Sequence, residues 1–160
     1  MEEQGGFTRI HVSLPNHWAS RGETLWARKV GRDLYEVRNI PFYAYGLHFG
    51  DRVVANTEDP SRPPEITAVE QRSGHRTLRV MFKDFAPEAV RDAMLRSLER
   101  FDAYFEQATP RYYALDVEPE GNYDAVCEEL RKWEQDGLVA YETCQQRVPG
   151  SFDDEPPSPE

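Results

Sequence analysis

The sequence predicts an α+β fold in which an N-terminal β-rich, barrel-like half packs on a C-terminal ferredoxin-like α/β sandwich. Apolar residues alternate with period two in the first half and recur at three- and four-residue steps in the second. With 160 residues, the chain suits one compact domain or two small packed ones. We expect the β-rich part at 7–76 and the sandwich at 77–145, with a flexible N-terminus at 1–6 and a disordered acidic tail at 146–160.

Short strands separated by Gly and Pro turns fill the first half. The run that begins at Phe7 alternates polar and apolar side chains and ends at Pro15. Gly31 predicts the turn of one hairpin, and Ser73-Gly74 predicts the turn of another. The expected strands cover residues 7–14, 23–30, 34–40, 52–56, 65–71 and 76–82. Short strands joined in this way indicate a small barrel or a curled sheet.

The second half changes to helical spacing. Pro87 suits the first turn of a helix that we expect to reach Gln107, with an apolar stripe of Val90, Met94, Leu98, Phe101 and Phe105. A strand at 112–118, a helix between Asn122 and Gly137, and a last strand at 138–144 follow. This order predicts a two-layer sandwich of ferredoxin-like type.

The net charge of −10 comes entirely from the second half. Residues 1–76 hold ten basic and ten acidic side chains, whereas residues 77–160 hold nine basic and nineteen acidic ones. An acidic surface repels a nucleic-acid backbone and attracts a basic protein. We therefore expect a basic protein partner and no nucleic acid.

Several classes of protein do not fit the sequence. No apolar run reaches the roughly 18 residues of a membrane span, and the acidic start does not resemble a signal peptide. Cys127 and Cys144 form no Cys-x-x-Cys pair, which indicates a reducing cytoplasm. The spacing of histidines, serines and glycines matches no metal site, nucleophile motif or phosphate loop. We therefore predict no membrane contact, metal, cofactor or catalytic residue.

One stretch resembles a known family. Leu25-Trp26-Ala27, then Asn39-Ile40-Pro41-Phe42 with Ala44-Tyr45-Gly46, and then Gly50-Asp51 are similar to the core of a bacterial family of small uncharacterised proteins, a domain of unknown function. The resemblance extends over residues 8–145. It implies a bacterial cytoplasmic protein and brings no catalytic residue with it.

The first candidate site is an aromatic segment with two polar members. It comprises Phe42, Tyr43, Tyr45, His48 and Asp51. Such side chains could line the pocket of a small enzyme or ligand-binding protein. The alternative, which we favour, is a barrel core with a rigid corner set by Pro41 and Gly46.

The second candidate site is a group of carboxylates around the end of the 112–118 strand: Asp116, Glu118, Glu120 and Asp124. Asp116 and Glu118 share a strand face and could act as an acid–base pair, although a solvated outer face is the simpler alternative. Gathered together, the four would form a negative patch for a cationic partner. The leading hypothesis is therefore a non-catalytic acidic protein that binds a basic protein, such as an inhibitor or immunity protein that neutralises a toxin.

A third hypothesis is an RNA-associated module that uses Arg28, Arg32, Arg38 and Arg52 among the aromatic residues of the first half. The acidic second half counts against it, and pairing with neighbouring acids is a simpler role for these arginines.

The tail yields a test of the predicted boundaries. Removing the residues after Pro149 should leave Tm nearly unchanged, because the tail adds charge and proline but almost no apolar surface. Scanning calorimetry of the full-length and shortened chains measures the effect. A loss of several degrees would show that Phe152 packs on the body.

Overall fold

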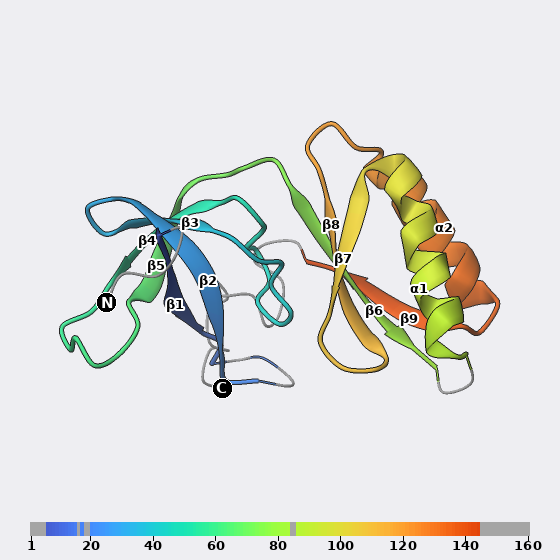
Figure 1. Ribbon diagram of the computed structural model, residues 1–160, viewed down its shortest axis with the longest axis horizontal. Coiled ribbons are helices and arrows are strands. Elements are labelled where there is room, and N and C mark those ends of the chain that lie inside the picture. Colours follow the sequence, from blue (N-terminus) through green and yellow to red (C-terminus); the bar gives the residue numbers. More distant parts are fainter. Residues whose placement is uncertain (1–5, 16, 18–19, 84–85, 145–160) are drawn as a thin grey trace, which may run out of the picture.

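The computed structural model describes residues 6–15, 17, 20–83 and 86–144, which form two lobes (Figure 1). The first lobe contains strands β1 to β5, and the second contains strands β6 to β9, helices α1 and α2, and the 3₁₀ helix η2. This arrangement confirms the predicted α+β class. The acidic tail and nearly all of the expected N-terminal segment lie outside the described residues. Neither α-helix of the described part is long and apolar enough to cross a membrane.

The five strands of the first lobe close into a ring. They are β1 (Phe7–Ser13), β2 (Gly22–Gly31), β3 (Leu34–Val37), β4 (Arg52–Asn56) and β5 (Glu65–Gln71). Neighbours pair antiparallel, and a parallel contact between His11 and Glu65 joins β1 to β5. Alternate side chains point inward and build one core, which includes Ile10, Val12, Leu25, Ala27, Tyr35, Val37, Val53, Ala55 and Ile66.

The second lobe is an antiparallel sheet with helices on one face. Its strands are β6 (Arg76–Phe82), β7 (Ala103–Gln107), β8 (Tyr112–Val117) and β9 (Val139–Thr143), in the order β7-β8-β6-β9. Helices α1 (Glu88–Arg96) and α2 (Tyr123–Gln135) cover the face turned away from the ring (Figure 1). The core between the sheet and the helices includes Leu78, Val80, Phe82, Leu95, Leu98, Tyr113, Leu115, Val126 and Leu130.

The prediction that the first helix continues to Gln107 is wrong beyond Arg96. There α1 ends, the 3₁₀ helix η2 (Ser97–Phe101) follows, and the remaining residues form the edge strand β7. Phe101 and Phe105 are four residues apart, a spacing that places two side chains on one face of either a helix or a strand. The apolar stripe therefore could not distinguish the two structures.

The hairpin expected around Ser73-Gly74 is also wrong. Strand β5 pairs with β1 and β4, whereas β6 pairs with β8 and β9 in the other sheet. The segment at 72–75 is thus the link between the lobes. Strand β6 buries even Thr77 and Arg79, because the helices cover one face of its sheet and the first lobe covers part of the other.

Residues 41–45, which we call the clamped segment, have almost no strand partners of their own. A buried carboxylate from β2 supplies acceptors for this segment. Glu23 accepts the backbone N–H groups of Phe42 at 2.6 Å, Tyr43 at 3.0 Å and Ala44 at 2.9 Å. Because a buried N–H group must find a partner, Glu23 takes over the role of a neighbouring strand.

A buried arginine from the other lobe binds carbonyl groups of the clamped segment. Arg79 of β6 is 1% exposed, and it donates to the carbonyls of Pro41, Tyr43 and Ala44, each at 3.0 Å. Its Nε also donates to Glu142 at 3.2 Å. Separating the lobes would strip a buried guanidinium of its acceptors, which is costly.

Glu23→Gln tests this arrangement. The amide has one oxygen and no charge, so at least one N–H group loses its acceptor, and we expect a loss of about 2–3 kcal/mol in the free energy of unfolding. Urea unfolding at pH 7 measures it, with the exposed Glu70→Gln as the matched control. Equal stability of the two variants would contradict the role of Glu23.

Candidate functional site

The aromatic side chains of the first candidate site pack between the lobes. The guanidinium of Arg79 lies 4.8 Å from the centre of the Tyr45 ring. Tyr43 stacks on Tyr112 with 5.9 Å between ring centres, and the Tyr112 hydroxyl donates to the carbonyl of Phe42. These contacts give Phe42, Tyr43 and Tyr45 a structural role in the interface.

His48 and Asp51, the polar members of the same candidate site, lie in the loop that follows the clamped segment and hold this loop in place. His48 Nδ1 lies 2.7 Å from the hydroxyl of Thr77, and burial lowers the pKa of His48 to about 4. The fully buried Asp51 accepts the backbone N–H groups of His48 at 3.0 Å and Ser73 at 2.8 Å. Asp51 therefore ties this loop to the link between the lobes.

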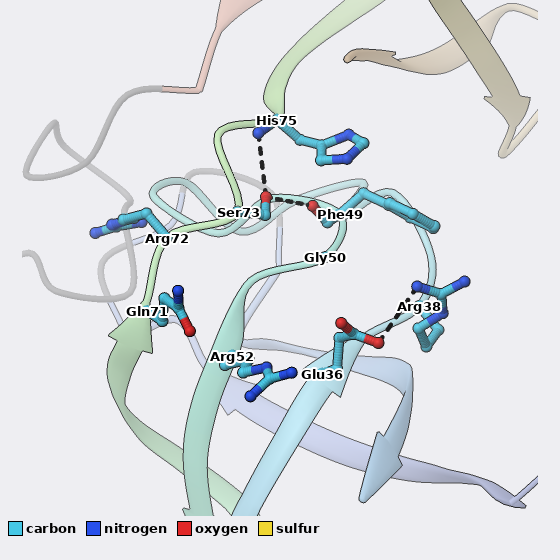
Figure 2. A pocket seen from close by; sticks show the side chains of 9 residues that line it. All are labelled: Glu36, Arg38, Phe49, Gly50, Arg52, Gln71, Arg72, Ser73 and His75. Atoms are coloured by element: carbon cyan, nitrogen blue, oxygen red, sulfur yellow. Dashed lines mark hydrogen bonds and ion pairs between the residues drawn. The ribbon is translucent and has the colours of Figure 1, made fainter. Parts of the chain in front are cut away.

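A cavity of about 370 Å³ opens beside this loop, where β3 and β5 end and β4 begins (Figure 2). Glu36, Arg52 and Gln71 form its floor, and they are direct neighbours across the three strands. Arg38 and Arg72 border it as well. We call this hollow the arginine cavity. The sequence singled out Arg38 and Arg52, with pairing to neighbouring acids as the simpler role and an RNA surface as the alternative, and the structure does pair Arg38 with Glu36. The cavity itself could not be predicted, because strand register is not visible in the sequence.

One wall of the arginine cavity is a row of stacked groups (Figure 2). The Arg38 guanidinium lies 4.8 Å from the centre of the Phe49 ring, and this ring lies 5.3 Å from that of His75. His75 Nδ1 is 2.8 Å and 3.0 Å from the two carboxylate oxygens of Asp116. Each member of the row is thus oriented by the next.

The cavity region contains the three residue types of a hydrolase triad: Ser73, His75 and Asp116. Their hydrogen bonds, however, are not those of a catalytic triad. The Ser73 hydroxyl donates to the carbonyl of Phe49 at 2.7 Å and accepts the backbone N–H of His75 at 3.1 Å. Its proton is not directed to the imidazole, so the serine is not activated as a nucleophile.

The thiol of Cys144 is not activated either. Burial raises its pKa to about 12, which keeps the thiol protonated.

The four carboxylates of the second candidate site occupy different environments. Asp116 is 6% exposed and pairs with His75, so it does not belong to the outer surface. Glu118 is half-buried, whereas Glu120 and Asp124 are exposed. Asp124 lies in the first turn of α2, where a negative charge interacts favourably with the helix dipole.

Glu118 and Glu120 form part of a different acidic group, completed by Glu99 and Asp102. The N–H of Glu118 donates to the carbonyl of Asp102 at 3.0 Å, which joins the two turns. Tyr104, 40% exposed, lies near all four carboxylates, and desolvation together with these charges raises its pKa. We call these five residues the acidic surface. The incorrect helix to Gln107 concealed the contribution of Glu99 and Asp102.

In the described part of the chain, no three His, Cys, Asp or Glu side chains are grouped as metal ligands.

Two further arginines belong to the RNA hypothesis. Arg28 lies 5.4 Å from the centre of the Phe7 ring, and Arg32 is exposed in the turn after β2.

His48→Asn should change how stability depends on pH. The unfolded chain takes up a proton on His48 near pH 6.5 and the folded protein near pH 4, so wild-type stability falls as the pH drops between these values. The asparagine keeps a polar atom for Thr77 but does not titrate, and its stability profile should be flatter in this window by up to about 3 kcal/mol. Urea unfolding at pH 7, 5.5 and about 4.5 measures the difference. Parallel profiles would contradict the buried neutral imidazole.

The sequence and the fold both have counterparts. Residues 23–141 match the family described as Domain of unknown function (DUF4265), and no curated protein matches. The fold is similar to a solved structure titled "Novel crystal structure of a hypothetical protein from Neisseria gonorrhoeae", with a TM-score of 0.73 and 16% identity over 86% of this chain and 94% of that chain. At this identity the likeness concerns the fold alone. Since the family match covers most of the chain, the protein belongs to the DUF4265 family.

Proposed function

We propose that the protein is a non-catalytic binding protein whose acidic surface engages a basic protein. The observation that supports this most is that Glu99 and Asp102 lie in one turn, Glu118 and Glu120 lie in another, and the N–H of Glu118 joins the two turns beside the exposed Tyr104 by donating to the carbonyl of Asp102. Among the described residues, none of the four carboxylates has an ion-pair partner within 4.0 Å. The nearby Arg100 pairs instead with Glu129, at 3.1 Å. The negative charge of the surface therefore remains available to a partner.

The position of Tyr104 adds to this proposal. Tyr104 lies on β7, which is an edge strand of its sheet. A tyrosine combines a large apolar body with a polar hydroxyl and is enriched at interface hot spots. Carboxylates around such a residue speed association with a basic partner and disfavour acidic ones. An inhibitor or immunity protein that neutralises a toxin is the specific form that we propose.

The finer fold and the cellular location belong to the same proposal. We infer a barrel for the ring and a ferredoxin-like sandwich for the second lobe, which has the element order β6-α1-β7-β8-α2-β9 and the antiparallel sheet order β7-β8-β6-β9. We also infer a cytoplasmic location, which the free thiols of Cys127 and Cys144 fit.

Neutralising the acidic surface tests the function. The variant carries Gln at 99, 118 and 120 and Asn at 102. Its control carries Gln at 58, 70 and 134 and Asn at 136, all exposed positions. Each protein is immobilised, binding proteins are captured at low salt from cells that encode it, and the rate of association with the captured partner is measured. We expect the captured partner to be basic. It should associate with the acidic-surface variant at a rate lower by roughly tenfold or more than with the wild type. Added salt should lower the rate of its association with the wild type.

Two results would contradict the proposal. One is the absence of any basic protein among those captured at low salt. The other is equal weakening of association by the two variants, which would reflect net charge rather than this surface. Both variants should keep the wild-type Tm to within a few degrees, because none of the substituted carboxylates is fully buried and surface charges contribute little to stability individually.

A further inference from the structure

The arginine cavity concentrates positive charge in an acidic protein. Arg38, Arg52 and Arg72 all border it, and Glu36 supplies the one carboxylate among its described lining residues. The whole chain has a net charge of −10, so a cluster of three guanidiniums around one cavity is not expected from its composition. They come from the end of β3, from β4 and from the link between the lobes (Figure 2). The fold, rather than a run in the sequence, brings them together.

The donors of two of these arginines, Arg38 and Arg52, are only partly used by the residues that the structure describes. Glu36 lies beside Arg52 in the strand register, yet its carboxylate pairs with Arg38, and the distance is a long 3.4 Å. Among the described residues, Arg52 has no carboxylate within 4.0 Å. The Nε of Arg38 is buried and has no hydrogen-bond partner in the same part of the chain. Arg52, which is exposed at the cavity, therefore has guanidinium donors that an acceptor in the cavity can reach.

The groups around the cavity are held in place before any ligand arrives. Arg38 is stacked on Phe49, and Phe49 in turn lies against His75. Arg72 lies 3.6 Å from the fully buried Asp51, which keeps its position on the other side. Because the side chains are already ordered, a ligand would not have to immobilise them.

From these observations we propose that the arginine cavity binds the phosphate group of a small phosphorylated molecule. Planar guanidiniums match the oxygens of a phosphate, and the Arg52 guanidinium, which has no carboxylate within 4.0 Å among the described residues, presents the donors for such a contact. A cavity of about 370 Å³ also leaves room for the body of a small molecule. Gln71, also at the cavity, supplies polar groups for that body. The site lies on the first lobe and its link, apart from the acidic surface of the second lobe, and it does not depend on the function proposed above.

Titration calorimetry at pH 7 and low salt tests the site with three probes: inorganic phosphate, glucose 6-phosphate and citrate. We expect both phosphates to bind the wild type and glucose 6-phosphate to bind more tightly than citrate. Arg52→Gln should weaken glucose 6-phosphate binding by roughly tenfold or more, the effect expected for a lost charged hydrogen bond. The matched control is Arg32→Gln, an exposed arginine away from the cavity, which should leave binding unchanged.

Both variants are first checked by circular dichroism, and Arg52 is exposed, so the fold should persist. The Tm of the wild type should also rise with phosphate and that of Arg52→Gln should not, which provides a second readout. If neither inorganic phosphate nor glucose 6-phosphate bound the wild type at concentrations up to about 10 mM, the proposal would be overturned. Tighter binding of citrate than of glucose 6-phosphate would overturn the phosphate assignment, and equal weakening by Arg32→Gln would overturn the site.

Discussion

The two lobes depend on one five-residue segment that is bound by a carboxylate from one lobe and a guanidinium from the other. Glu23 of the first lobe accepts three N–H groups of this segment, and Arg79 of the second donates to three of its carbonyls. Each charge replaces a strand partner that the segment lacks. The contact also sets where the first lobe meets the sheet. The loop that follows the segment, fixed by Asp51, then defines one side of the arginine cavity.

Patterns of local spacing predicted the α+β class and most strands, because period-two alternation reflects one buried face. They also located the cap of α2 at Asn122, which accepts the N–H of Ala125 at 3.0 Å. The family motif gains a physical meaning only in the fold. Asn39 accepts the N–H of Trp26 at 2.6 Å, which anchors the entrance to the clamped segment. Neither Glu23 nor Arg79 could be predicted as a partner, since contacts across more than 18 residues leave no spacing signal.

The candidate sites were predictable to different degrees. The positions of Glu118 and Glu120 after the strand could be predicted from the sequence. Asp116, in contrast, is buried, because strand alternation turns its side chain toward the face of the sheet that the first lobe covers, where it orients His75. The arginine cavity required the register of three strands, which no single stretch of sequence contains. The result is a chain with charges of opposite sign on separate lobes: carboxylates gathered around Tyr104 and guanidiniums around the cavity.

Native-state hydrogen exchange tests the central claim most directly, because it reports on the clamped segment residue by residue. The amides of Phe42, Tyr43 and Ala44 are bound by Glu23 alone and lie in no strand ladder. If the clamp joins the lobes, these amides should exchange only on global unfolding, with the same free energy of opening as the amide of Val80 in the buried strand β6. Exchange of the three amides with an opening free energy several kcal/mol below that of Val80 would show that the segment opens locally and that the lobes are held together by other contacts.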